Sequence, residues 1–145
     1  MATENIKLVC RWFDEVWNQR RTDTIDELLT DESISYSESG PLLGKQEFKE
    51  RVHSAFLSAF PDLQMTVDGT VAEGDQVVVR WSAKATHLGD GLGVAPTGRK
   101  VTFRGMTWLR FQDGKMVEGS DCWNQSGLIQ SLCAHESPQD DLATF

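Results

Sequence analysis

The side chains best placed to do chemistry follow a short turn near the carboxyl end of the chain. Asp113-Gly114 is typical of a two-residue β-hairpin turn, and segments with strand character flank it on both sides. If these residues form the turn, Gln112 pairs with Lys115 and side chains alternate between two faces along the second strand. One face then carries a carboxylate, a hydroxyl, a thiol and an amide, from Glu118, Ser120, Cys122 and Asn124.

Other strands contribute to the same face. In the segment 76–87 the odd positions are mostly apolar, which places Trp81 inside and His87 at the inner end of the strand. Phe103 shares this face across the hairpin, and Tyr36 has the same parity as an apolar neighbour in the segment 34–39. A mostly apolar sheet face with several polar groups is typical of a ligand cavity, so we predict that Tyr36, Trp81, Phe103, Ser120 and Cys122 bind ligand.

Two residues of this set could act as bases. Glu118 could transfer a proton if apolar surroundings raise its pKa, or it could be a structural carboxylate bonded to the backbone or to Tyr36. His87 could be a base at the cavity rim or a hydrogen-bonded core or loop histidine. Alternation places Asp121 on the outer face, and only a local β-bulge would reverse that placement.

The spacing of apolar residues in the rest of the sequence predicts the helices and strands that position these side chains. Apolar residues at helical spacing predict helices at 3–19, 23–29 and 45–59, and Pro61 ends the third. Strands follow at 63–67, 76–87 and on both sides of the turn. This order predicts an α+β fold, a curved mixed or antiparallel sheet wrapped over about three helices, as one domain over residues 1–133. The glycine-rich segment 89–93 is interpreted as a mobile lip over the cavity, and residues 134–145 as a mobile acidic tail.

The composition of the chain argues against several classes of binding partner. The 145 residues carry a net charge of −8, which argues against nucleic acid or an anionic membrane as partner. No apolar run is long enough to span a membrane, and the first residues lack the features of a signal peptide, so we expect a cytoplasmic protein. The three cysteines are expected to be reduced and mostly buried, and the scattered histidines predict no metal site.

Five segments carry a family resemblance: FDEVWNQR, FPDLQMTV, VVVRWSAKATH, PTGRKVTFRG and DGKMVEGSDCWNQSGLIQSL. In this order and at these separations they resemble the SnoaL-like polyketide cyclases of the nuclear transport factor 2-like superfamily, over roughly residues 5 to 133. The resemblance implies a cone-shaped fold with an internal pocket. It also implies ring closure of a small apolar or aromatic carbonyl compound by aldol chemistry, without metal or organic cofactor.

The family's last strand typically reads G-K-I-x-E-x-W-x-x-x-D, in which the aspartate is the acid–base group. Gly114, Lys115, Met116 and Glu118 match this pattern, and Asn124 stands in place of the aspartate. An amide can orient a carbonyl but cannot transfer a proton, which leaves three alternatives open. The chain could be a cyclase-like lyase or isomerase that uses Asn124, Glu118 and His87, a non-catalytic ligand-binding module, or an assembly domain.

The outer sheet face predicts self-association. It combines apolar and charged side chains, namely Val78, Met106, Trp108, Val117 and Trp123 with Arg80, Arg104, Arg110 and Asp121. Such a face is large for a monomer to expose. We therefore expect a twofold homodimer that packs sheet to sheet, as family members commonly do.

Overall fold

The computed structural model describes residues 2–134 and, as backbone, residues 141–144. Three helical segments precede the long strands. Helix α1 (Ala2–Arg11) continues as the π-helical segment η1 (Trp12–Asn18), followed by α2 (Asp23–Leu28). The third segment runs through α3 (Gly44–Phe48), the π-helical η2 (Lys49–His53) and α4 (Ser54–Ala59). The predicted helices are therefore confirmed, and a further helix, α5 (Gln125–Cys133), ends the domain beyond the last predicted strand.

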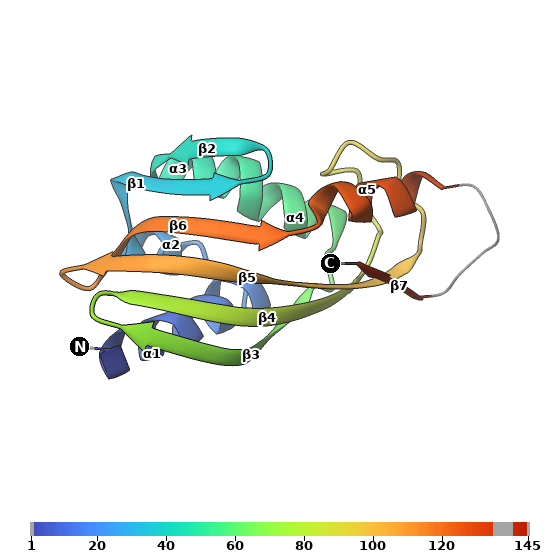
Figure 1. The fold of residues 1–145 in the computed structure, drawn as a ribbon. Helices are drawn as coiled ribbons and strands as arrows, with labels where there is room; N and C mark the ends of the chain where they lie inside the picture. The colour runs from blue at the N-terminus through green and yellow to red at the C-terminus, as the bar shows by residue number, and fades with distance from the viewer. Residues whose placement is uncertain (1, 135–140, 145) are drawn as a thin grey trace.

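The sheet covers these helices. Its order is β2 (Gly40–Leu43), β1 (Leu29–Ser37), β6 (Lys115–Trp123), β5 (Lys100–Gln112), β4 (Gln76–Thr86) and β3 (Gln64–Glu73). Only β1 and β6 run parallel among these six, so the sheet is mixed. Figure 1 shows the strands in front of α1 to α4, with α5 beyond the end of β6. The α+β architecture predicted from the sequence is confirmed.

The predicted tail lies largely outside the described residues. Asp141–Thr144 form strand β7, which pairs in parallel with the first residues of β5. No described helix is long and apolar enough to cross a membrane.

A β-bulge in the carboxy-terminal hairpin sets the faces of β6. Next to the turn, Gln112 pairs with Lys115 and Phe111 with Met116, as predicted. Arg110, however, pairs with Glu118, so Val117 is an extra residue and every later side chain changes face. The prediction that Asp121 and Trp123 point outward is therefore wrong.

Trp123 packs into an aromatic cluster between sheet and helices. Its ring stacks on Phe103 with centroids 4.9 Å apart and lies 6.0 Å from Trp81 and 5.8 Å from Phe56. Gly105 is the partner of Trp123 on β5, and a Cβ there would lie 2.5 Å from the Trp123 Cβ and 2.9 Å from the Trp81 ring. The cluster therefore needs a residue without a side chain at position 105.

Two further expectations from the sequence are wrong. The segment 89–93 does not line the cavity: Gly89 and Gly91 lie so close to α4 that a Cβ would be 1.9 Å from the Ser58 carbonyl oxygen and 2.1 Å from that of Ala55. The glycines there permit close backbone packing. Cys10, Cys122 and Cys133 are all exposed and unpaired instead of buried.

Gly105→Ala tests the packing that follows from the bulge. We expect a loss of about 1–3 kcal/mol in the free energy of unfolding, because the added methyl group overpacks the Trp81–Trp123 contact. Urea unfolding followed by tryptophan fluorescence measures it. Gly69→Ala on β3 is the matched control, because a Cβ there meets only the end of the Arg80 side chain at 3.9 Å. Equal stability of the two variants would contradict the inward position of Trp123.

Candidate functional site

A cavity of about 240 Å³ lies between the inner sheet face and the helices. Its lining is mainly aromatic and aliphatic, with residues from η1, α3, η2 and α4 on one side and from strands β1 to β6 on the other. The aromatic residues of the lining are Trp12, Phe13, Trp17, Phe48, Phe56, Trp81, Phe103 and Trp123. An apolar cavity of this kind suits a small, flat, mostly apolar ligand.

Asp121 is the acidic group that the bulge turns into this cavity. Its Oδ1 accepts a hydrogen bond of 2.6 Å from the Thr107 hydroxyl, which in turn accepts one of 3.0 Å from the Trp81 indole nitrogen. An indole N–H can only donate, so the hydroxyl proton of Thr107 is committed to Asp121. The two hydrogen bonds therefore run in one direction, from the Trp81 indole through the Thr107 hydroxyl to the Asp121 carboxyl. They fix one carboxyl oxygen and leave Oδ2 without a hydrogen bond among the described residues.

The surroundings of Asp121 favour its protonated form. Burial raises the pKa of this carboxyl, and the hydrogen bond from Thr107 opposes the rise only in part. The Asp121 side chain is exposed to water within the cavity that it lines, and the protein atoms around it desolvate the carboxyl in part. A carboxyl that keeps its proton closer to neutral pH can act as both acid and base.

Only some of the residues predicted to bind ligand line the cavity. Trp81 and Phe103 line the cavity as predicted, while their role in binding stays a prediction. Ser120 and Cys122 do not line the cavity. They pair with Trp108 and Met106, two exposed residues of the outer sheet face. The bulge at Val117 explains this error, because it exchanges these two residues for Asp121 and Trp123.

Of the three residues considered for acid–base roles, Asn124 and His87 lie outside the cavity lining, and Glu118 lies within it. Asn124 precedes α5, and its Oδ1 accepts a hydrogen bond of 2.9 Å from the Gly127 amide, so it caps the helix and does not line the cavity. Glu118 does line the cavity, but its carboxylate binds the Arg110 Nε at 3.0 Å, a partially exposed ion pair rather than a bond to the backbone or to Tyr36.

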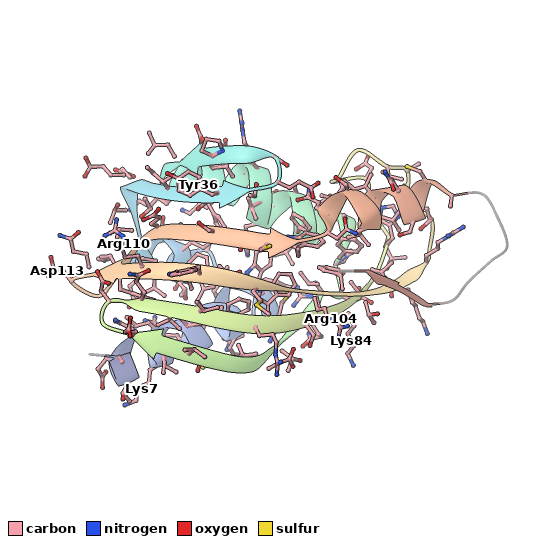
Figure 2. The ribbon with its side chains drawn as sticks, viewed as in Figure 1. Lys7, Tyr36, Lys84, Arg104, Arg110 and Asp113 are labelled. Carbon is pink, nitrogen blue, oxygen red and sulfur yellow. The ribbon has the colours of Figure 1, made fainter. Side chains whose placement is uncertain are left out.

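His87 and Tyr36 are likewise outside the cavity. His87 is fully buried beside Phe60, its Nδ1 accepts a hydrogen bond of 3.2 Å from the Thr97 amide, and burial lowers its pKa. It is therefore a loop and core histidine. Tyr36 is 41% exposed and lines a shallow surface groove with Arg110. Figure 2 labels Tyr36 and Arg110 on the sheet, in front of the helices.

Comparison with known proteins identifies the family to which the chain belongs. The family model of the SnoaL-like polyketide cyclases matches residues 7–132. Among solved structures, a proposed SnoaL-like polyketide cyclase from Jannaschia sp. CCS1 has a TM-score of 0.85 at 26% identity, over 93% of this chain and 95% of that one. AclR, a proposed hydroxylase from Streptomyces galilaeus, has a TM-score of 0.79 at 34% identity, over 92% and 98%.

A third structure shows the same fold. IdmH, a proposed polyketide cyclase from Streptomyces antibioticus, has a TM-score of 0.73 at 23% identity, over 88% of this chain and 97% of that one. No protein of curated function matches the sequence. Within the described residues, no three or more His, Cys, Asp or Glu side chains form a cluster that could hold a metal ion.

Asp121→Asn tests the raised pKa through stability. The unfolded carboxyl ionises near pH 3.9, whereas the folded one stays protonated to a higher pH. Wild type therefore loses stability relative to Asp121→Asn as pH rises from about 4, until the pH passes the folded pKa. Urea unfolding between pH 4 and 8 measures this gap, and a constant gap would contradict the raised pKa.

Asp62→Asn is a control of opposite sign. Burial raises the pKa of Asp62, but the Thr86 amide and hydroxyl, each donating at 2.7 Å, outweigh it and lower the pKa overall. Its ionised form stabilises the fold, and this stabilisation is lost below about pH 4. When the urea series is extended to pH 2, Asp62→Asn should lose stability relative to wild type as pH rises toward 4, with a constant difference above it.

Proposed function

Because the chain belongs to the SnoaL-like polyketide cyclase family, we propose that it is a cofactor-independent lyase or isomerase that closes a ring in a small aromatic carbonyl compound. The single observation that carries this proposal is the inward carboxyl of Asp121, with a raised pKa, in an apolar cavity. In this proposal Asp121 takes the role that the sequence pattern assigned to position 124.

The chemistry needs one group that accepts and then returns a proton. The Asp121 carboxylate removes a proton from a carbon beside a carbonyl group, which leaves an enolate. The enolate carbon attacks a second carbonyl of the same molecule, and a carbon–carbon bond forms as that carbonyl becomes an alkoxide. Asp121 then returns its proton to the alkoxide, so the group ends as it began. Aromatic walls hold the flat chain folded and exclude water.

The reason for preferring a non-catalytic binding module no longer applies. That reading rested on the amide of Asn124, whose oxygen caps α5 outside the cavity. A helix cap carries no information on whether the cavity can transfer a proton. A binding module stays an outcome of the test below: it would bind a carbonyl ligand without moving its proton.

The identity of 34% to AclR favours hydroxylation of a similar substrate as a second candidate. The two reactions differ in their use of oxygen. An aldol ring closure takes up no O₂ and leaves the mass of the substrate unchanged or lowers it by one water. A hydroxylation that draws on O₂ adds one oxygen atom, so mass spectrometry of the product formed under ¹⁸O₂ separates them.

Proton transfer by Asp121 predicts deuterium exchange at an acidic carbon. Methyl 4-acetylbenzoate in D₂O with the protein should exchange its acetyl protons, observed by proton NMR, and Asp121→Asn should lower the rate about 10²–10⁴-fold. Asp68→Asn removes a carboxylate that accepts from Ser82 on strands β3 and β4, outside the cavity, and should leave the rate unchanged. Binding without exchange in wild type would contradict an acid–base role.

We also propose the homodimer through the outer sheet face. Trp108 and Met106 on this face are 56% and 51% exposed, and the bulge adds Ser120 and Cys122 to it while it removes Asp121 and Trp123. Burial of these large apolar side chains favours association at about 25 cal/mol per Å² before association costs.

Cys122 reports on this dimer directly. If the sheets pack together, alkylation of Cys122 by iodoacetamide should slow as protein concentration rises, while Cys10 and Cys133, exposed on helices α1 and α5, react at a constant rate. Peptide mass spectrometry follows all three. Trp108→Glu should abolish the protection and yield a monomer in sedimentation equilibrium, and a wild-type monomer with unprotected Cys122 would contradict the proposal.

A further inference from the structure

The lining of the cavity includes one cationic side chain, Arg51 of η2. Helical spacing places it beside the apolar stripe of Phe48, Val52 and Phe56, which all line the same cavity. The opposite lining includes a row of hydroxyl groups and an amide, from Ser35, Ser37, Ser39 and Gln125. Arg51 and Ser39 are exposed, and Ser35, Ser37 and Gln125 are half-buried, so this polar part of the lining lies toward solvent and is taken as the mouth of the cavity.

The guanidinium of Arg51 makes no hydrogen bond or ion pair within the described part of the chain. The two carboxylates closest to it on its own helix are already engaged: Glu47 accepts from the Leu43 amide at 3.0 Å, and Glu50 accepts from Gln46 at 3.0 Å. The other charged residues of the lining also have partners, since Glu118 binds Arg110 and Asp121 binds Thr107. Arg51 is therefore the lining cation left available to a ligand.

We infer that Arg51 and the hydroxyls of Ser35 and Ser39 form a carboxylate subsite at the cavity mouth. A planar guanidinium binds a carboxylate through two parallel hydrogen bonds, and hydroxyl groups supply further donors. The proposal rests on the proposed function, because it names the substrate as an aromatic carbonyl compound that bears a carboxylate. The chain has a net charge of −8 and repels anions at long range, so an anionic ligand needs such a local cation.

This subsite would also orient the substrate. A carboxylate held at the mouth keeps its charge in a hydrated environment and away from the Asp121 carboxyl, while the apolar ring and its ketone enter the cavity. The reverse orientation would place two carboxyl groups together in an apolar space, which desolvation and like-charge repulsion both oppose. The ketone carbon, and not the acid, is then the group presented to Asp121.

A matched pair of ligands tests this subsite. Isothermal titration calorimetry compares 4-acetylbenzoate with its methyl ester, which share the ring and the ketone and differ in charge. Wild type should bind the acid about tenfold more tightly than the ester, because the guanidinium forms charge-assisted hydrogen bonds with the acid alone and exposure to water limits their strength. Arg51→Gln should remove the preference and leave the affinity for the ester unchanged.

Arg80→Gln is the matched control. It removes the same charge from β4 at a position outside the cavity lining, and the preference for the acid should persist. Equal affinities for acid and ester in wild type, failure of both compounds to bind, or an equal loss for both compounds in Arg51→Gln would each overturn the subsite.

The deuterium-exchange experiment distinguishes a failure of the carboxylate subsite from a failure of the proposed proton transfer by Asp121. A preference for the acid that depends on Arg51, together with exchange that is independent of Asp121, supports the subsite and overturns the proton transfer. Exchange that depends on Asp121, together with an acid preference that survives Arg51→Gln, does the opposite.

Discussion

The site depends on one extra residue in strand β6. Without the bulge at Val117, Asp121 would lie on the outer sheet face beside Trp108, and the cavity would carry Ser120 and Cys122 instead. A carboxyl in bulk water keeps an ordinary pKa, whereas a serine hydroxyl does not titrate near neutral pH and a free thiol ionises only near about pH 8.5. The bulge therefore determines whether a carboxyl group lines the cavity at this position.

The same irregularity requires compensation in packing. Turning Trp123 inward adds a large ring to a space already bordered by Trp81 and Phe103, and the sheet accommodates it because position 105 has no side chain. Among the described residues only Thr107 donates a hydrogen bond to the inward carboxyl, and desolvation by the surrounding protein disfavours its ionised form. The aromatic cluster stabilises the fold, whereas ionised Asp121 destabilises it. Such a conflict is typical of a functional site.

The sequence predicts the architecture well because periodicity reports burial. The helical spacing of Val9, Phe13 and Val16 and the alternation through Val77, Val79 and Trp81 both correspond to buried residues of the core. The turn at Asp113-Gly114 is also where it was predicted, and Asp113 has a φ of 52°, which the short turn requires.

The candidate site is less predictable because alternation carries no information on a bulge. A single inserted residue reverses every later assignment, so a correct turn led to the wrong face for Asp121. The residue types did contain a signal. Three aromatic side chains, Trp81, Phe103 and Trp123, pack best on one face, and only a shifted register brings them together opposite Gly105. A register chosen by the packing of the largest side chains would have placed Asp121 inside. The function of a strand like β6 is therefore better inferred from what its tryptophan must contact than from its distance to a turn.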